Sequence, residues 1–527
     1  MSGSSTSTPV IPPVDRIAAG DVDATAAGFG ARVRSALIWR SGAQIVTQLL
    51  SWTSTLMVIR ILNPADYGLF AMCQAVIAFL TFLNGYGLVS ALVASETIDT
   101  HRLRQAFGLM LLLNGGLAVA QLILAPYAAD YYGQPMVANM LRVQAVIYLS
   151  TPFITLPEVL MGRSLDFRKA AYVTFLSGIV AAGVAIGGAL AGWGVWTLVW
   201  APIAGFYVKA IGYLIVTRFF IWPSFDFRGA GPTILFAISL LGSQLAFLVQ
   251  SQADVFIGGR VLDPHALGLY AEALFLTQIF VSKFVPPINE VTFPIYARMQ
   301  ADRTRVAAAL CKAIKLVMLV ACPIYLGMAV TAEPLVLTIL GDKWAEMASF
   351  VSLLALAMPF LTLQVMFPPM CNAIGRPGQG ARIAMIGAGI MLAAFLIGIN
   401  FGAIGLAWAW LLGYPVFALS TAHLAGRLIG LTFGPLLRAV MPGILAAAAM
   451  AAMVAAADHL LLPSGLLPGI RLGMLVAIGA ASYGGLLLVL ARDTVRELIG
   501  LISGKGLGEI GGLGEIGEPG ETGDAAA

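Results

Sequence analysis

Long apolar runs separated by short polar connections dominate the 527-residue chain. The runs reach about 20 residues or more, the length at which an α-helix crosses the roughly 30 Å hydrocarbon core of a bilayer. Gly, Pro, Asn and Asp punctuate most connections, as in Asn63-Pro64 and Asp263-Pro264. The pattern therefore predicts about fourteen transmembrane helices. They lie near 35–62, 67–94, 104–128, 137–160, 169–191, 193–217, 232–261, 266–296, 306–331, 346–374, 380–400, 402–426, 438–459 and 470–491.

One connection occurs twice in the chain. Residues 60–71 and 260–271 align without a gap at an offset of 200 residues, and both begin Arg-x-Leu-x-Pro and end Gly-Leu-x-Ala. We call these two segments the repeated turns. Six predicted helices separate them, so the two copies are expected to have the same orientation. This arrangement predicts two six-helix lobes related by an axis along the membrane normal, as in transporters with parallel repeats.

The predicted fold is an all-α integral membrane protein with two parallel-repeat lobes around a central cleft and two extra C-terminal helices. The ends of the chain are poor in apolar runs, which predicts disorder there. The expected domains are a disordered cytoplasmic tail (1–34), an N-lobe of helices 1–6 (35–218), a cytoplasmic linker (219–230), a C-lobe of helices 7–12 (231–428), helices 13 and 14 (429–491) and a Gly/Glu-rich cytoplasmic tail (492–527).

Composition excludes a soluble globular protein. Only 11% of the residues are charged and 59% are hydrophobic, whereas a soluble domain carries about 25% charged residues. Of the 30 Lys and Arg residues, 23 fall in every second predicted loop or in the helix ends beside it when the N-terminus is placed in the cytoplasm. The positive-inside rule therefore places both termini on the cytoplasmic side, which we call the predicted inner side. The net charge of +4 is a topology signal and does not indicate a nucleic-acid partner.

No catalytic or metal site is expected from the sequence. The four Cys lie inside apolar segments and the four His are scattered, so neither residue type has metal-ligand spacing. The predicted loops contain no nucleophile triad and no acid pair. We therefore expect a protein that is not an enzyme.

Polar residues within the first and seventh predicted helices are the first candidates for a transport site. Arg40 and Gln44 begin a polar face in the first helix, and Gln244, Ser251 and Asp254 share a face in the seventh. A charge at mid-bilayer costs roughly 2.5–3.5 kcal/mol on insertion scales, so such groups usually face a cavity. Hydrogen bonding between helices is the structural alternative for the uncharged side chains.

The sixth and eighth predicted helices carry further charges. Lys209 lies in the sixth, and Lys283 and Glu290 lie in the eighth on either side of Pro286-Pro287. Lys283 and Glu290 are seven residues apart and would face the same way on a regular helix. The prolines would bend this helix. Internal ion pairing, for example of Lys283 with Asp254, is the alternative to a role in the cleft.

Arg60 and Arg260 end matching helices at the predicted outer side. Arginine suits phosphate because its planar fork makes bidentate contacts. The pair is therefore a candidate for holding an anionic head group at the outer mouth of the cleft. Interfacial anchoring is the alternative.

Four stretches resemble the polysaccharide-export branch of the flippase and multidrug-exporter superfamily, more narrowly the Wzx-type flippases of exopolysaccharide and O-antigen repeat units. Residues 60–71 resemble the family's R-x-L-x-P-x-x-Y-G turn. Residues 192–199 resemble its G-x-G-V-W-A-L-V segment, with Thr197 in place of alanine. Residues 291–300 resemble its V-x-F-P-x-x-S-R-x-Q helix end, with Ala297 in place of serine. Residues 341–344 resemble its G-x-x-W loop, although Met347 replaces a following alanine; the whole resemblance covers about residues 31–430.

The resemblance implies a secondary transporter that moves undecaprenyl-pyrophosphate-linked oligosaccharides across the bacterial inner membrane by alternating access, from the cytoplasmic to the periplasmic leaflet. It implies no cofactor beyond a coupling ion, H⁺ or Na⁺, between which the sequence does not choose. Membrane lipid and the polysaccharide polymerase and chain-length machinery are the implied partners. Asp254 and Glu290 are the candidates for ion coupling. The candidates for substrate binding are Arg40, Gln44, Arg60, Lys209, Gln244, Arg260 and Lys283.

Several other functions stay open at this point. A lipid II-type flippase would share the architecture and the number of helices. A cation or drug exporter would need anionic groups to dominate the cleft. A membrane polysaccharide polymerase or ligase would need a sizeable outer loop, whereas the longest predicted outer connection, near 332–345, is short. A scaffold without transport would leave the charges within the helices unexplained.

Overall fold

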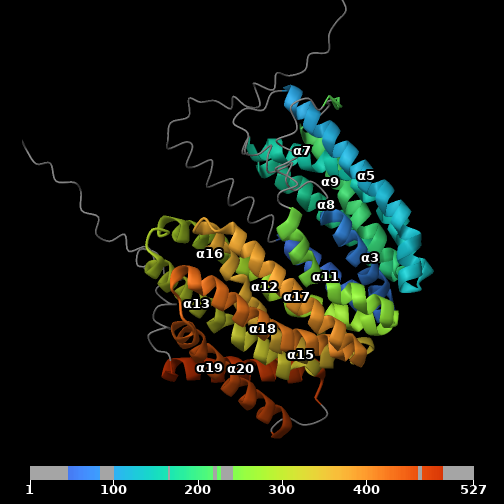
Figure 1. Cartoon of the computed structure of the whole chain (residues 1–527). Helices are drawn as coiled ribbons and strands as arrows, with labels where there is room; N and C mark the ends of the chain where they lie inside the picture. The colour runs from blue at the N-terminus through green and yellow to red at the C-terminus, as the bar shows by residue number, and fades with distance from the viewer. Residues whose placement is uncertain are drawn as a thin grey trace, which may run out of the picture. The chain divides into compact units, whose positions relative to one another are not determined.

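The computed structural model is built of helices and short connections and contains no strand among its described residues (Figure 1). The described residues are 46–82, 100–163, 167–217, 222–226, 241–460 and 466–490. Lipid cannot satisfy backbone N–H and C=O groups, and helices satisfy them internally. The all-α fold predicted from the apolar runs is therefore confirmed.

The membrane spans agree with the sequence pattern in number and place. Among the described residues, 11 helical stretches are long and apolar enough to cross a membrane, and one of them, Pro377–Ile429, covers two helices. Twelve of the predicted spans are thereby accounted for. The predicted spans at 35–62 and 232–261 lie only partly within the described residues, where helix runs through 46–61 and over Leu241–Val261.

The chain divides into two compact units. Unit 1 comprises Met1–Leu248 with Gly259–Gly268, and unit 2 comprises Val249–Gly258 with Leu269–Ala527. The second repeated turn therefore packs largely with the first unit. The boundaries of the two predicted lobes stay a prediction.

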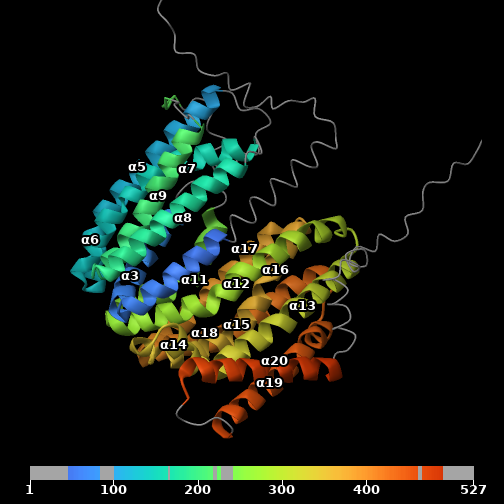
Figure 2. The same cartoon turned by 180° about the vertical axis from the view of Figure 1, so that it is seen from behind.

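Unit 1 is a bundle of long apolar helices in which α5, α7, α8 and α9 run side by side (Figures 1 and 2). Clusters of buried apolar side chains fill the bundle, with Leu103, Phe107 and Leu156 in one of them. The named helices of this unit are α3 (Pro64–Phe82), α5 (Thr100–Tyr132), α6 (Pro135–Gln144), α7 (Val146–Arg163), α8 (Phe167–Leu190) and α9 (Trp196–Thr217). A helix from Leu241 to Val261, α11, and the first residues of α12 (Pro264–Arg298) join this unit to the next.

The two repeated turns start matching helices. Proline stands at the first position of α3 and of α12, where its missing N–H is not needed. The Asp66 carboxylate accepts a hydrogen bond from the Asn63 backbone N–H in the first copy, and the Asp263 carboxylate accepts from the N–H groups of His265 and Ala266 in the second. These side-chain caps satisfy donors at the helix starts that have no intrahelical partner.

The two repeated turns also touch each other reciprocally within unit 1. A Cβ atom at Gly68 would overlap the backbone carbonyl of Pro264, and a Cβ atom at Gly268 would overlap that of Pro64. Glycine is required at both places because no side chain fits between the two backbones. The shared Gly of the repeat is therefore a packing residue.

Unit 2 is built around α13, which packs against α15 and α19, while α18 packs against α15 and α17. Asp302 caps α13 by accepting hydrogen bonds from the backbone N–H groups of Thr304 and Arg305. After α12, the elements of this unit are α13 (Arg303–Val330), α14 (Ala332–Ile339), η1 (Asp342–Trp344), α15 (Met347–Val365), α16 (Phe367–Ala373), α17 (Pro377–Gly398), η2 (Ile399–Phe401), α18 (Gly402–Ile429), α19 (Phe433–Leu460) and α20 (Pro468–Leu490).

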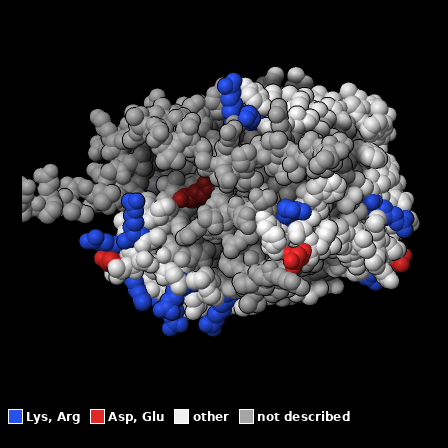
Figure 3. All heavy atoms as spheres, turned by 90° about the horizontal axis from the view of Figure 1, so that it is seen from above, with Lys and Arg blue, Asp and Glu red and all other residues white. Residues whose placement is uncertain are grey.

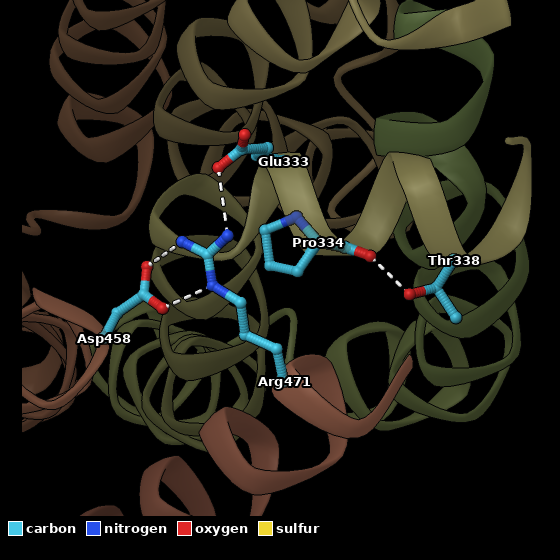
Figure 4. Close-up of polar contacts among 5 residues, drawn as sticks. All are labelled: Glu333, Pro334, Thr338, Asp458 and Arg471. Carbon is cyan, nitrogen blue, oxygen red and sulfur yellow. Dashed lines mark hydrogen bonds and ion pairs between the residues drawn. The ribbon is translucent and has the colours of Figure 1, made fainter. Parts of the chain in front are cut away.

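The two extra C-terminal helices, α19 and α20, are firmly joined to unit 2. The Arg471 guanidinium donates two hydrogen bonds of 2.7 Å to the Asp458 carboxylate and a longer one of 3.3 Å to Glu333 on α14 (Figure 4). Farther along α20, the Tyr483 hydroxyl donates to the backbone carbonyl of Leu319 on α13. These polar contacts, with the apolar packing of α19 on α13, make the last two helices part of the unit.

Candidate functional site

The predicted site residues do not all fall in one unit. Arg60, Lys209 and Arg260 belong to unit 1, and Asp254, Lys283 and Glu290 to unit 2. Arg40 and Gln44 lie outside the described residues, and of Gln244 only the backbone, in α11, is described. The roles assigned to these residues from sequence stay predictions.

The outer arginines differ in their contacts. The Arg260 guanidinium donates a 3.0 Å hydrogen bond to the Tyr131 carbonyl and lies 4.9 Å from the centre of the Tyr131 ring. The neighbouring Gly259 packs closely on the Tyr132 ring. Arg60 is exposed, and no hydrogen bond or ion pair to another described residue engages it. Arg260 therefore fastens the second repeated turn to the end of α5, while Arg60 has no such anchor.

Lys209 has an acidic partner that the sequence reading missed. Its ammonium lies 3.6 Å from the Glu158 carboxylate on α7 and 5.6 Å from the centre of the Tyr213 ring. Glu158 follows Pro157 inside the fourth predicted span, and that position in an apolar run was the available signal. The Lys209 charge is therefore balanced within unit 1.

Asp254 is fully buried and its carboxyl oxygens are already engaged. The Tyr270 hydroxyl donates a 2.6 Å hydrogen bond to Oδ2, and the Trp410 indole N–H lies 3.1 Å from the same oxygen. The indole N–H also donates to the Tyr270 hydroxyl at 2.8 Å, and Oδ1 accepts from the Val255 backbone N–H. The group thus joins α11, α12 and α18, with no lysine among these partners. The internal pair of Asp254 with Lys283 considered from sequence is not formed.

The polar side of α11 turns into unit 2. Gln250, one helical turn before Asp254, donates a 2.6 Å hydrogen bond to the Ala384 carbonyl on α17 and is buried. Interhelical hydrogen bonding of this kind is common where small and polar residues hold membrane helices together. Gln250 therefore holds α11 and α17 together by an interhelical hydrogen bond.

Three further charges without a described partner lie on α12. Lys283 and Glu290 are exposed, and Glu272, which the sequence reading missed, is half-buried. Among the described residues none of the three has a hydrogen-bond or ion-pair partner. Because Lys283 lies eleven positions after Glu272 and seven before Glu290, all three fall within about 20° on a helix of 3.6 residues per turn. We call them the charged face of α12.

The position of this face within the membrane span is unusual. The continuous helix Pro264–Arg298 is 35 residues long, so a rise of about 1.5 Å per residue places Lys283 near its middle. Elsewhere, in the view of Figure 3, the described surface is mostly uncharged, and its Lys and Arg side chains stand in small groups. An exposed charge in the middle of a span needs water, because hydrocarbon does not solvate it.

Helical-wheel arithmetic applied to the whole eighth span would have found Glu272. The Lys283–Glu290 spacing identified two members of the face, and Glu272 is in phase with both. By contrast, no sequence signal pairs Asp254 with Trp410, which lies 156 positions away. That contact depends on how α11 and α18 pack.

Three curated relatives are similar to this chain over much of its length. It is 27% identical over 365 residues to the succinoglycan biosynthesis transport protein ExoT of Rhizobium meliloti (strain 1021), covering 69% of this chain and 73% of that protein. It is 22% identical over 430 residues to the teichuronic acid biosynthesis protein TuaB of Bacillus subtilis (strain 168), covering 80% and 88%. It is 21% identical over 322 residues to the lipopolysaccharide biosynthesis protein WzxC of Escherichia coli (strain K12), covering 60% and 65%.

Solved structures share the fold at low sequence identity. The lipid II flippase MurJ in an inward closed conformation superposes with a TM-score of 0.72 at 12% identity, covering 87% of this chain and all of that chain. An inward-facing multidrug transporter of the MATE family and MOP superfamily superposes with a TM-score of 0.55 at 14% identity, covering 75% and 98%. The chain therefore has the fold of these transporters.

A family sequence profile decides the relationship. The profile described as polysaccharide biosynthesis protein matches residues 57–349, more than half of the 527 residues. This range contains both repeated turns and the whole charged face of α12. The chain therefore belongs to the polysaccharide biosynthesis protein family.

Proposed function

We propose that this protein is a flippase that moves polyprenyl-pyrophosphate-linked oligosaccharides, of the undecaprenyl class, from the cytoplasmic to the periplasmic leaflet of a bacterial inner membrane. Relatives named for transport and biosynthesis of succinoglycan and lipopolysaccharide support the substrate class. The positive-inside distribution supports cytoplasmic termini. Membrane lipid and the polymerase and chain-length machinery are the proposed partners.

The observation that carries the proposal is the charged face of α12. A pyrophosphate and several sugars cannot cross hydrocarbon unaided, because their polar groups would lose their hydrogen bonds with water. A helix that exposes unpartnered charges in the middle of a span provides a wet path for such a head group. The polyprenyl tail can stay in the lipid.

Lys283 is the proposed contact for the pyrophosphate. Its ammonium is exposed near mid-span and has no acidic partner among the described residues. Charge-assisted hydrogen bonds to phosphate oxygens are about twice as strong as neutral ones. Lys209 is a weaker candidate because Glu158 already balances its charge at 3.6 Å.

A cation exporter of the same superfamily is the rival that the geometry keeps in view, because the charged face of α12 holds two acids and one base. The spacing of these charges favours an anionic substrate. Glu272 and Glu290 lie about 17 Å and about 10 Å along the helix from Lys283, too far to contact its ammonium on a rigid helix, so Lys283 stays available to bind an anion. The likeness to a lipid II flippase is one of fold alone.

Deletion of the gene tests the proposed function in a strain that has no second flippase. We expect loss of a surface polysaccharide and retention of its lipid-linked repeat unit in the cytoplasmic leaflet, measured by polymer immunoblot and by leaflet-specific labelling. Plasmid-borne wild-type protein should restore the polymer, as should Glu333→Gln, whose change lies on α14 and off the charged face. Normal polymer in the deletion strain would show that the proposed function is wrong.

A further inference from the structure

We infer that Glu272 is the carboxylate to which the coupling monovalent cation, a proton or Na⁺, binds. The inference rests on the proposed function. A flippase driven by an ion gradient needs a coupling ion that binds its two conformations with different affinities. Sequence left Asp254 and Glu290 as the acidic candidates. Asp254 differs from Glu272 in its hydrogen-bond partners, and Glu290 differs in being exposed where Glu272 is half-buried.

Asp254 is poorly arranged to bind a transported cation. The Tyr270 hydroxyl donates to Oδ2, the Trp410 indole N–H shares its hydrogen between Oδ2 and the Tyr270 oxygen, and the Val255 N–H donates to Oδ1. These positive ends of dipoles occupy the places that a cation would take. A cation could bind only by displacing three donors inside a fully buried cluster, so Asp254 is assigned a structural role.

Glu272 has the opposite surroundings. It is half-buried, and no hydrogen bond or ion pair links it to another described residue. A carboxylate removed from much of the water, without donors of its own, gains most from a bound cation. It lies eight residues after Pro264, about 12 Å from the predicted outer end of the helix.

Among the described residues of unit 2, no Lys, Arg or His pairs with Glu272. Lys283, on the same face, is about 17 Å away along the helix. Helices α11, α13, α15 and α18 contact α12 through Asp254, Tyr325, Phe350 and Trp410, respectively. In unit 2, the described charged or titratable Asp, His, Lys and Arg residues of these four helices are Asp254, Arg303, Arg305, Lys312, Lys315, His423 and Arg427. Apart from Asp254, all lie toward the predicted inner ends of α13 and α18, whereas Glu272 lies toward the outer end of α12.

Binding at Glu272 also changes the charge of the transport path. With the cation absent, the charged face of α12 carries two acids and one base, and with the cation bound it is balanced. An anionic pyrophosphate near Lys283 therefore meets a different electrostatic potential in the two states. This difference is what links ion and substrate.

Cation binding by the purified full-length protein in lipid nanodiscs tests the inference without any substrate. The probes are ²²Na⁺ alone, measured by scintillation proximity, and proton uptake after an acid pulse in weak buffer. We expect the wild-type protein to bind one of the two cations. Glu272→Gln should lose ²²Na⁺ binding at least tenfold or, where the proton is the cation, take up about one proton fewer per chain than the wild type. Glu272→Asp should retain the wild-type signal, and Glu333→Gln should retain ²²Na⁺ binding. Size-exclusion profiles check that each variant is folded.

Two results would overturn the inference: no ²²Na⁺ binding by the wild type together with equal proton uptake by the wild type and Glu272→Gln, or a loss that follows Glu290→Gln and spares Glu272→Gln. A second assay separates this inference from the proposed function. It follows translocation of a fluorescent polyprenyl-pyrophosphate disaccharide in vesicles, with a proton or sodium gradient. Glu272-dependent cation binding without translocation would count against the proposed function alone. Equal gradient dependence in the wild type and in Glu272→Gln would count against Glu272 alone.

Discussion

Two polar regions of unit 2 contain charged side chains within membrane spans, and they differ in whether those charges have hydrogen-bond partners. Around Asp254, both carboxyl oxygens accept hydrogen bonds, from donors on α11, α12 and α18. On the charged face of α12, Glu272, Lys283 and Glu290 have no such partner among the described residues. The comparison teaches that an intramembrane charge alone does not indicate function, and that its partners decide between holding helices together and serving a transported ion.

The largest effect is expected at the Asp254 cluster. Asp254→Ala leaves the Tyr270 O–H without an acceptor in a buried site, and an unsatisfied buried group costs about 1–3 kcal/mol. The cavity left by the side chain adds to this loss. We expect a lower thermal unfolding temperature in detergent and a smaller yield of folded protein. Asp342→Ala, at an exposed turn, should change neither, and equal stability of both variants would show that the cluster holds nothing together.

Lys283→Gln tests the other side of the comparison. If Lys283 holds pyrophosphate, the variant loses a charge-assisted hydrogen bond worth about 1.5–3 kcal/mol, or roughly 10- to 100-fold in transport. Stability should stay close to that of the wild type, because no described residue depends on Lys283 as a partner. Polymer output and flipping in vesicles measure the first expectation, and thermal unfolding measures the second.

Lys343→Gln is a matched control for this variant, since it removes the same charge from an exposed turn between α14 and α15. Wild-type transport by Lys283→Gln would remove Lys283 from the substrate path. A large loss of stability in Lys283→Gln would instead move it to the same class as Asp254.

The fold was largely predictable from sequence because its determinants are local. Apolar runs of membrane length give the spans, and Asn63-Pro64 and Asp263-Pro264 give the helix starts, through fixed proline geometry and side-chain caps. The close approach of Gly68 and Gly268 was not predictable, since it depends on two turns 200 positions apart meeting backbone to backbone.

The candidate site was predictable only where periodicity on one helix suffices. The seven-residue spacing placed Lys283 and Glu290 on one face, and the same rule covers Glu272. Whether a charge has a partner depends on tertiary packing. Asp254, Lys209 and Lys283 are all charges within predicted spans, yet Asp254 is bound by Trp410 and Lys209 is paired with Glu158. That distinction is invisible to any single-helix pattern.

The two outer arginines repeat the comparison on a smaller scale in unit 1. Arg260→Ala removes a hydrogen bond to the Tyr131 carbonyl and a cation–π contact, together worth about 1–2 kcal/mol at an exposed site. Arg60→Ala removes no such contact, so we expect little change in its unfolding temperature. Because Arg260 fastens the second repeated turn, its loss should impair transport while membrane insertion stays intact. Equal stability of the two variants would mean that Arg60 and Arg260 play the matching roles expected from sequence.

The smallest effect is expected at Asp302, a partnered acid like Asp254 but partly exposed to water between α12 and α13. The hydrogen bond from the Thr304 hydroxyl, helped by the backbone N–H groups of Arg305 and Thr304, lowers the pKa of Asp302. A lowered folded-state pKa contributes stability that is fully present above the unfolded-state pKa and is lost as the pH falls through the folded value. Asp302→Ala should therefore be slightly less stable than the wild type at pH 7, and the gap in unfolding temperature should narrow on acidification, leaving the part that comes from the lost helix cap. Asp302→Asn keeps an acceptor for the helix cap and should lose mainly the pH-dependent part. A gap that stays constant from neutral to acid pH would mean that the charge of Asp302 contributes nothing, and that partners matter for this acid only through the cap geometry.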